Sequence, residues 1–338
     1  MALNWAIRGT GRFAERRIVP ALQKAHGCRL IAVISRDRGR AEAFASEQGI
    51  QRAYDGLQSA LQDPAIEAVW VATPHALHRE AVLALARAGR HVLCEKPLAT
   101  TVANARAMVD ACHHAGVALG TGFHLRHHPL HIEARRLVRD GDAGQIIAAE
   151  AEWSLRPGPP TASAAWRQDR EVAGGGIVTG TGVHAIDLLR YVLDDEIETV
   201  SAIIDRVPNS GSEVDSLENA AVCLLQFRRG TMATVRCLRG VHEPTNDLRI
   251  AGREATLRVR QSLDEQTRGA LEARGCDSRL SGVPAGADLF ALEAEAFAQA
   301  VAGGRDPNAS GLDGLRAVEA TVAIYQSAAT GRAVRLAT

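Results

Sequence analysis

The chain has 338 residues, and its 39 Lys and Arg side chains balance 39 Asp and Glu side chains, so it carries no net charge at pH 7. A chain of this length exceeds one ordinary hydrophobic core, so we expect two domains. The charge balance argues against binding to nucleic acid or to an anionic membrane. No apolar run approaches the length of a membrane span. The first residues enter a short apolar run instead of a signal peptide, so we expect a soluble cytoplasmic protein.

The six cysteines are scattered along the chain, and none forms a CxxC pair. Most of them lie in apolar runs. We therefore expect buried free thiols in a reducing compartment, with neither disulfides nor a metal site.

The first 120 residues alternate short β-rich runs with helical periods. We expect strands over residues 3–7, 30–35, 68–73 and 91–95, separated by helices over about 12–25, 38–48 and 76–88. This alternation predicts βαβ units and a doubly wound parallel sheet of the Rossmann type. Parallel sheets bind ligands beyond the carboxyl ends of their strands. Residues that directly follow the expected strands are therefore candidate site residues.

The first expected strand runs into the sequence GTGRFA at residues 9–14, a GxGxxA pattern that opens a helix. Gly9 permits a tight turn, Gly11 lets the backbone approach a pyrophosphate, and Ala14 is small enough for helix–strand packing. Helix N-terminal amides would face the phosphates. The turn therefore predicts dinucleotide binding. Arg8 interrupts the apolar strand just before it, and both an edge charge and a helper to the phosphates fit this residue.

The second expected strand ends at Ser35 and is followed by Arg36 and Asp37. Enzymes that use NAD usually place an acidic residue at this tip, where it holds the ribose 2′-hydroxyl. Here a hydroxyl and a guanidinium occupy the tip, and arginine matches a 2′-phosphate. We therefore favour NADP(H). Asp37, one residue late, leaves NAD(H) open, and a solvated helix start also accounts for the arginines.

Lys96 directly follows the fourth expected strand, in the sequence HVLCEKPLAT at residues 91–100. Lysine seldom sits at the lip of a buried strand, because burying an ammonium group is costly unless something pairs with it. A charge that happens to cap the strand and a group placed to touch a ligand are both consistent with this position. The other strand ends, at Gly9, Ser35 and Thr73, converge on the same crevice and favour the ligand.

Longer β-rich runs begin after residue 122, where we place the domain boundary, giving domains 1–122 and 123–338. We expect helices over about 130–140, 287–302 and 312–329, and strands over 146–155, 197–206, 218–227, 231–239, 248–252 and 255–260. Adjacent runs with short turns predict an α+β domain with a mainly antiparallel sheet and helices on one face. The open face of such a sheet commonly packs against another subunit, so a homo-oligomer is expected.

A long irregular segment, residues 156–176, separates the first two of these strands. Loops of this length are usually functional or disordered. Its Trp166-Arg167 pair fits either a contact with the cofactor or a surface anchor. A triple glycine at residues 174–176 then leads into a helix that carries His184 and Asp187.

Together these features resemble the Gfo/Idh/MocA family, named for glucose–fructose oxidoreductase, inositol dehydrogenase and a rhizopine-catabolism protein. The resemblance covers nearly the whole chain, and the EKP motif is its most specific part. The matching motifs are GTG at 9–11, ATP at 72–74 followed by ALH at 76–78, EKP at 95–97, GTGFHLR at 120–126, WR at 166–167 and GGG leading to VHAID at 183–187. Within the family, the chain looks most similar to the NADP-dependent reductases of 1,5-anhydro-D-fructose.

The resemblance implies a role for each matching residue. Lys96 would hydrogen-bond the substrate oxygen and stabilise developing alkoxide, with Glu95 and a cis bond before Pro97 setting its aim. His184 would be the general acid/base. Cofactor contacts would come from Gly9, Thr10, Gly11, Arg12, Phe13, Ser35, Arg36, Arg40, Thr73, Pro74, His75, His78, Glu95, Lys96, Trp166 and Arg167. The implied substrate, a sugar, anhydrosugar or cyclic polyol, would contact Lys96, His124, Arg126, Thr181 and His184. No metal is implied.

One departure from the family pattern concerns the helix of His184. The family has an aspartate four residues before this histidine, and Gly180 occupies that position here. The family's Asn and His in the GTNHH-type run are also replaced, by Gly122 and Phe123. The leading hypothesis is an NADP(H)-dependent oxidoreductase, which intact Lys96 and His184 favour. The alternative, which Gly180 favours, is a cofactor-binding sensor or regulator that has lost turnover.

Overall fold

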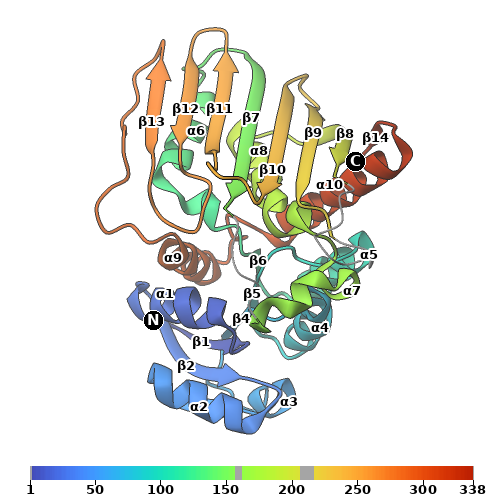
Figure 1. Ribbon diagram of the computed structural model, residues 1–338. Coiled ribbons are helices and arrows are strands. Elements are labelled where there is room, and N and C mark those ends of the chain that lie inside the picture. The colour runs from blue at the N-terminus through green and yellow to red at the C-terminus, as the bar shows by residue number, and fades with distance from the viewer. Residues whose placement is uncertain (1, 157–161, 206–216, 338) are drawn as a thin grey trace. The chain divides into compact units, whose positions relative to one another are not determined.

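The computed structural model describes residues 2–156, 162–205 and 217–337. The chain forms two compact units, each with its own sheet (Figure 1). The N-terminal unit comprises Met1–Phe123 and Phe290–Leu315, and the C-terminal unit comprises His124–Leu289 and Arg316–Thr338. Residues 290–315 thus pack with the N-terminal unit, although the sequence pattern assigns them to the second domain.

The N-terminal unit is built on a six-stranded parallel sheet in the order β3-β2-β1-β4-β5-β6. This confirms the Rossmann-type sheet that the sequence predicts. The strands are β1 (Leu3–Arg8), β2 (Cys28–Ile34), β3 (Arg52–Tyr54), β4 (Ala68–Val71), β5 (His91–Cys94) and β6 (Leu119–Thr121). Every residue of β4 is buried, as expected for a strand covered on both faces.

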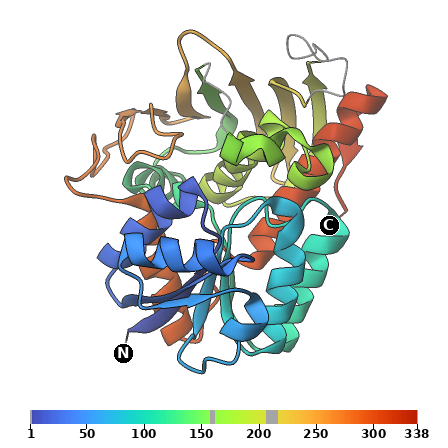
Figure 2. The same cartoon turned by 60° about the horizontal axis from the view of Figure 1, so that its bottom comes forward.

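The helices of this unit connect successive strands, and α4 and α5 lie side by side (Figure 2). They are η1 (Ala14–Ile18), α1 (Val19–Lys24), α2 (Arg38–Gln48), α3 (Leu57–Ala60), η2 (His75–Leu77), α4 (His78–Arg87) and α5 (Val102–His114). The sequence pattern missed α5. Thr101 caps it by accepting a 3.2 Å hydrogen bond from the backbone N of Asn104, and Ala105, Met108 and Cys112 form its buried stripe.

Helix α9 (Leu289–Ala302) returns to the N-terminal core, next to α1 (Figure 1). Phe297 on α9 packs against Trp5 of β1, with ring centroids 5.2 Å apart, and Trp5 lies 6.2 Å from Trp70 of β4. Gly120 explains why the ring fits, because a Cβ there would lie 2.9 Å from the Phe297 side chain. The burial of these large aromatic side chains explains why residues 290–315 pack with the N-terminal unit.

The C-terminal unit is built on an eight-stranded sheet in the order β13-β12-β11-β7-β10-β9-β8-β14. Only the central pair β7 and β10 is parallel among its described strands. The strands are β7 (Ile146–Leu155), β8 (Ile197–Ile204), β9 (Ala220–Phe227), β10 (Met232–Arg239), β11 (Asn246–Gly252), β12 (Thr256–Arg260), β13 (Ala270–Arg274) and β14 (Val334–Arg335). The mainly antiparallel sheet is thus confirmed, although the sequence pattern missed β13 and β14. Residue 206, the last of one predicted strand, lies outside the described residues.

Helices cover one face of this sheet and leave the other face open. Helices α6 (Pro129–Arg139), α8 (Val183–Leu193) and α10 (Gly311–Thr330) contribute to the same apolar core as the strands. The shorter elements are η3 (His124–His127), η4 (Ala162–Gln168), α7 (Arg170–Ala173) and η5 (Val178–Gly182). Contrary to the expectation from the sequence, the helical stretch Arg170–Leu193 is long and apolar enough to cross a membrane, but 83% of its apolar window is buried within the protein, as in a core helix.

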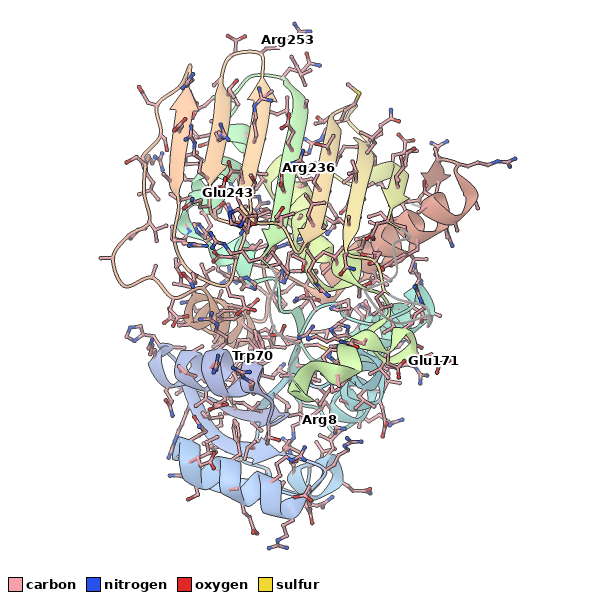
Figure 3. All side chains as sticks on the ribbon, in the orientation of Figure 1. Arg8, Trp70, Glu171, Arg236, Glu243 and Arg253 are labelled. Carbon is pink, nitrogen blue, oxygen red and sulfur yellow. The ribbon has the colours of Figure 1, made fainter. Side chains whose placement is uncertain are left out.

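The open face of the sheet carries two kinds of side chain. Alternation on β9 and β10 turns Cys223 and Val235 inward and leaves Val222 and Arg236 facing outward. Figure 3 labels Arg236 on this face. The exposed large apolar residues on β7 to β10 are Ile147, Ile203, Val222, Leu224 and Met232. Cross-strand ion pairs join Arg236 to Glu152, Arg249 to Glu150, Arg258 to Asp247 and Arg260 to Glu272. All six cysteines are free thiols; four are buried, as predicted, whereas Cys28 and Cys276 are only half-buried.

Candidate active site

The turn after β1 is shaped for a close approach of backbone groups. Gly9 has a φ of 126°, and a Cβ there would lie 2.6 Å from the carbonyl oxygen of Ala72. Any other residue would therefore be strained and would clash with the loop after β4. A Cβ on Gly11 would meet nothing within 4 Å among the described residues, so the space beside this backbone is open. Both features fit the pyrophosphate turn that GxGxxA predicts.

The helix after this turn begins with a π-helical segment, η1. Pro20 stands in the first turn of α1. Proline has no N–H and its ring clashes with the carbonyl four residues earlier, and a wider π turn accommodates both defects. Ala14 is buried, as its place in the motif requires. Phe13 packs edge-on against Phe290, with ring centroids 5.5 Å apart.

Asp37, the residue that leaves NAD(H) open, caps helix α2. Its Oδ1 accepts a 2.7 Å hydrogen bond from the backbone N of Arg40. Ser35 Oγ in turn accepts a 3.4 Å bond from the backbone N of Asp37. Arg36 and Arg40 are exposed at the same tip, and Arg38 Nε donates to Glu42 Oε1 over 2.8 Å. The carboxylate therefore has a structural role that requires no ribose.

A buried histidine ties together the loops that follow β4 and β5. The His78 ring is fully buried, with Nε2 2.9 Å from the carbonyl oxygen of Thr73 and Nδ1 3.1 Å from that of Pro97. Burial lowers the pKa of His78 from its ordinary value. The side chain thus fixes the two loops that bear Thr73, Pro74, His75 and Lys96. This contact makes His78 a brace as well as a sequence-predicted cofactor residue.

Lys96 stands between two fixed neighbours. Glu95 is 7% exposed, and its Oε1 accepts a 3.1 Å hydrogen bond from Trp70 Nε1 (Figure 3). On the other side, the Lys96–Pro97 peptide bond is cis, as the family resemblance implies. A Cβ on Gly122 would lie 3.0 Å from the Glu95 carboxylate. Close packing on Glu95 therefore accounts for glycine where the family pattern has asparagine.

The candidate residues of the N-terminal unit follow neighbouring strands of one sheet. Gly9, Ser35, Thr73 and Lys96 come after β1, β2, β4 and β5, which are adjacent in the order β2-β1-β4-β5. Because these strands are parallel, their carboxyl ends lie along one edge. The sequence spacing alone predicts this arrangement.

In the C-terminal unit, His184 belongs to a group of three buried rings. It lies in the first turn of α8 and is 2% exposed. Its ring centroid is 4.7 Å from that of His124 and 5.0 Å from that of Trp153 on β7. His124 Nε2 lies 3.3 Å from the carbonyl oxygen of Asp264. The fold thus brings together two of the sequence-predicted substrate residues and adds Trp153 beside them.

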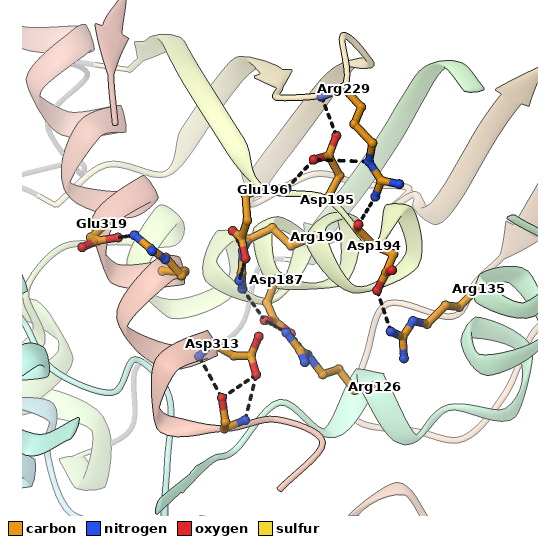
Figure 4. Close-up of polar contacts among 12 residues, drawn as sticks. Arg126, Arg135, Asp187, Arg190, Asp194, Asp195, Glu196, Arg229, Asp313 and Glu319 are labelled. Carbon is orange, nitrogen blue, oxygen red and sulfur yellow. Dashed lines mark hydrogen bonds and ion pairs between the residues drawn. The ribbon is translucent and has the colours of Figure 1, made fainter. Parts of the chain in front are cut away.

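Arg126 is part of a buried ion network (Figure 4). Its Nε and Nη2 donate to the two oxygens of Asp187 over 2.7 and 2.6 Å. Arg190 Nη1 lies 3.3 Å from the same carboxylate, and Arg190 also donates to both oxygens of Glu196, over 2.6 and 2.8 Å. Such bidentate contacts are strong and directional. Asp187 and Arg190 both belong to α8, so their contacts with Arg126 and Glu196 fix the helix that carries His184.

The triple glycine has a packing reason. A Cβ on Gly175 would lie 2.0 Å from Tyr325 Oη, and one on Gly176 would lie 2.3 Å from the Glu218 carbonyl oxygen. The buried Glu218 carboxylate accepts hydrogen bonds from the backbone N of Gly176 at 2.9 Å and of Val178 at 3.1 Å. Tyr325 Oη donates to the same carboxylate over 2.7 Å. Glu218 therefore caps the helical segment that leads to His184.

Gly180 lies within the π-helical segment η5, not in a regular α-helix. Its backbone N donates to the carbonyl oxygen of Gly176 over 2.9 Å. A Cβ on Gly180 would meet nothing within 4 Å in the described part of the chain, so packing does not require a glycine here. Thr181, the next residue, is 6% exposed.

Other histidines gather around the same unit. His127, His128 and His131 are buried, and desolvation lowers the pKa of His127 to about 4. Burial also lowers the pKa of His131, whose Nδ1 lies 2.9 Å from the carbonyl oxygen of Leu125. Among the described residues, no group of three or more His, Cys, Asp and Glu side chains is placed to hold a metal ion.

Trp166 and Arg167 lie in η4, in the C-terminal unit. The guanidinium carbon of Arg167 lies 4.5 Å from the Trp166 ring centroid. This stacked pair lies in the middle of the long segment that the sequence predicts to be irregular, and the structure shows that this segment contains η4 and α7. Residues 157–161 of that segment lie outside the described residues.

Sequence reasoning missed Trp153, Glu218 and Tyr325. Trp153 falls on the predicted strand 146–155, and no sequence pattern indicates that its ring lies beside His184. Glu218 lies at the start of a predicted strand. The only signal in the sequence was a glutamate directly before an apolar run. The contact from Tyr325 spans 107 residues, and no local pattern encodes it.

Two family models match this chain. "Oxidoreductase family, NAD-binding Rossmann fold" matches residues 3–123, and "GFO/IDH/MocA C-terminal domain" matches residues 131–258. The chain therefore belongs to the Gfo/Idh/MocA family of oxidoreductases.

Individual relatives match the chain over its full length. It is 32% identical over 335 residues to 1,5-anhydro-D-fructose reductase of Ensifer adhaerens, covering 99% of each chain. It is 30% identical over 336 residues to D-xylose 1-dehydrogenase (NADP(+)) 2 of Haloferax volcanii, covering 99% of this chain and 100% of the relative. The solved structure of aldose-aldose oxidoreductase from Caulobacter crescentus, complexed with glycerol, superposes with a TM-score of 0.90 at 30% identity over 99% of this chain and 100% of the other.

Proposed function

We propose that the protein is an NADP(H)-dependent oxidoreductase of a sugar, an anhydrosugar of the 1,5-anhydrofructose kind or a cyclic polyol. The observation that carries the proposal is the row of strand ends in the N-terminal unit, where the Gly9 turn and Lys96 follow strands of one parallel sheet. The full-length relatives are named as a reductase of an anhydrosugar and a dehydrogenase of an aldose. These names support turnover over the sensor alternative.

The residues at the strand ends fit a dinucleotide. The open space beside Gly11 and the start of the following helix suit a pyrophosphate. Ser35, Arg36 and Arg40 suit a 2′-phosphate, and the capping role of Asp37 is the reason to prefer NADP(H) over NAD(H). When bound, the cofactor supplies hydride transfer at the nicotinamide ring. The remaining assigned contacts are Thr10, Arg12, Phe13, Thr73, Pro74, His75, His78, Glu95, Lys96, Trp166 and Arg167.

Two side chains carry the proposed chemistry on the substrate. The Lys96 ammonium donates a hydrogen bond to the reacting substrate oxygen and stabilises negative charge that develops there. The braces from Glu95 and His78 hold its backbone in place, so little reorganisation is needed. His184 takes the hydroxyl proton in oxidation and returns it in reduction.

We assign the other predicted substrate residues two different roles. His124 and Thr181 are proposed to contact substrate hydroxyls, because His124 adjoins the His184 ring and Thr181 lies three residues before it. Arg126 gives Nε and Nη2 to Asp187. It is therefore proposed to act as a positioning residue for α8.

The proposal is tested with a panel of ketoses, anhydrosugars, aldoses and inositols, each with NADP(H) and NAD(H), followed at the nicotinamide absorbance. We expect turnover of at least one class with a preference for NADP(H). Lys96→Ala should lower kcat by about 10²-fold or more, as expected for the loss of a preorganised donor, while cofactor affinity changes little. If kcat survives and only KM rises, Lys96 binds substrate without taking part in the chemical step. No turnover of any class, with intact cofactor binding, would leave the sensor alternative.

We also propose that the open face of the C-terminal sheet forms a homo-oligomer interface. Ile203, Leu224 and Met232 are 78%, 58% and 62% exposed on neighbouring strands, and such contiguous apolar surface usually mediates association. Sedimentation of the protein should give a multiple of the 36.0 kDa chain. Leu224→Glu should shift it toward the monomer, and a wild-type monomer at micromolar concentration would contradict the proposal. The free thiols support a reducing, cytoplasmic location.

A further inference from the structure

Arg8 is a charged residue at a place that normally continues the apolar strand. It is the last residue of β1, after the fully buried Trp5, Ala6 and Ile7, and it is half-buried itself (Figure 3). Partial burial of a guanidinium is unfavourable unless an opposite charge or hydrogen bonds compensate it. The strand alone therefore does not explain why an arginine stands at this position.

The surroundings of Arg8 supply only part of that compensation. Within the described part of the chain, neither Arg8 nor Arg36 forms an ion pair or a side-chain hydrogen bond. The electrostatic neighbours of Arg8 are Glu80, an exposed residue of α4 that attracts it, and Arg36, which repels it less strongly than Glu80 attracts it. Partial burial is the main reason that the pKa of Arg8 is lowered from its ordinary value.

The two cations stand at adjacent strand ends. Arg8 pairs in register with Ile34 on β2, and Arg36 follows two residues after Ile34. The nearest carboxylate along the chain, Asp37, is engaged by the backbone N of Arg40. Two guanidinium groups that stand at adjacent strand ends and hydrogen-bond no shared carboxylate suit an anionic ligand, because one dianion would neutralise both.

We propose that Arg8 and Arg36 together hold the 2′-phosphate of NADP(H). The inference rests on the proposed function and adds a residue that sets cofactor choice. A phosphate can accept charge-assisted hydrogen bonds from both guanidinium groups at once. In the free protein these groups repel each other, so the phosphoryl group relieves an unfavourable contact that NAD(H) leaves in place.

The test is Arg8→Met, which keeps the length and the apolar stem of the side chain and removes the charge. Dissociation constants are measured by fluorescence for NADPH and NADH, and by competition for adenosine 2′,5′-bisphosphate and 5′-AMP. If Arg8 contributes about 1.5–3 kcal/mol, NADPH and the bisphosphate should bind roughly 10–150-fold more weakly. NADH and 5′-AMP should change by less than about twofold, since they lack the 2′-phosphate.

The matched control is Arg38→Met. Arg38 lies in the same tip, but its Nε is engaged by Glu42, so its removal should leave both affinities nearly unchanged. Arg8→Lys keeps a cation and should retain part of the NADPH preference. It also serves as the second variant if Arg8→Met fails to fold, because a phosphate contact then predicts a smaller loss that is confined to 2′-phosphorylated ligands.

Two outcomes would overturn the proposal. Equal weakening of NADPH and NADH would place Arg8 at the pyrophosphate, and unchanged affinities would make it an edge charge. Either result leaves the proposed function standing if the wild-type protein still prefers NADPH and Arg36→Ala removes that preference. Equal binding of both cofactors to the wild-type protein would instead contradict the NADP(H) assignment itself.

Discussion

The two units hold their candidate residues in different ways. In the N-terminal unit, Gly9, Ser35, Thr73 and Lys96 each follow a strand of one parallel sheet, so backbone topology alone places them along one edge. In the C-terminal unit, His184 is held by side chains from distant parts of the chain. Its neighbours His124 and Trp153 come from a 3₁₀ turn and from strand β7.

The difference also extends to the supporting interactions. Backbone carbonyls hold the loops of the N-terminal unit through His78, whereas buried carboxylates hold helix α8 and the segment before it. Removing either member of a buried ion pair destabilises the fold, because the remaining charge stays buried without a partner. Substitutions that remove a buried charge should therefore destabilise the C-terminal unit more than any surface change. Each prediction below tests one part of this contrast.

The largest effect is expected for Asp187→Ala. The substitution leaves the Arg126 and Arg190 guanidinium groups buried without their shared carboxylate. The free energy of unfolding should fall by about 3–5 kcal/mol, as for other broken buried ion pairs. Urea denaturation measures the loss.

The control is Glu150→Ala on the open face of the sheet. Glu150 pairs with Arg249, and the two side chains are 52% and 48% exposed. An exposed pair contributes at most about 1 kcal/mol. If Asp187→Ala and Glu150→Ala cost the same, the buried network does not hold α8 in the manner described.

Glu218→Ala should have the next largest effect. It leaves the buried backbone N–H groups of Gly176 and Val178 without their acceptor, whereas the hydroxyl of Tyr325 keeps Thr179 Oγ1 as a partner at 2.9 Å. Each such group costs about 1–3 kcal/mol when unsatisfied, so a loss of at least about 2 kcal/mol is expected. Tyr325→Phe removes one donor and should cost less. A Glu218→Ala protein as stable as the wild type would show that the carboxylate is not a cap.

The same contrast explains what the sequence could predict. Glycines and strand ends are local signals, and they located the Gly9 turn, the tip at Ser35 and Lys96. His184 was found through the family motif, but its supports were not. Glu218 and Tyr325 are separated by 107 positions, and Arg126 and Asp187 by 61. Contacts of that range depend on how the sheet and helices pack, and no spacing pattern records them. For this reason the sequence suggested that Arg126 contacts the substrate, whereas in the structure it forms an ion pair with Asp187.

Acid should weaken the protein through its buried histidines. The pKa of His127 is lowered to about 4, so between pH 6.5 and 4 the unfolded chain binds a proton there that the folded chain does not. Stability therefore falls as pH drops through this window. His127 alone should contribute a loss of about 2 kcal/mol between pH 7 and pH 5.

The measurement compares urea unfolding of the wild type and His127→Phe at both pH values. The variant lacks the titrating group but keeps a ring of similar size, so its stability should depend less steeply on pH. Identical slopes for the two proteins would mean that His127 is protonated in the folded state near pH 6.5. That result would contradict the desolvation that burial implies.

The smallest effect is expected for Gly180→Asp, which tests whether a carboxylate can be added near His184 in the C-terminal unit. A Cβ at this position meets nothing within 4 Å among the described residues, so the aspartate should fit. A negative charge one turn before His184 favours its protonated form. The acid limb of the pH–rate profile for alcohol oxidation, which requires a neutral base, should therefore move to higher pH, and activity should shift toward smaller polyols.

Gly180→Ala is the control, because it gains about 0.5–1 kcal/mol of helix propensity without a charge. If the aspartate variant folds and neither its pH–rate profile nor its substrate range differs from that of the alanine variant, the side chain at position 180 does not interact with His184. The glycine then only eases the chain out of the loop at 174–176.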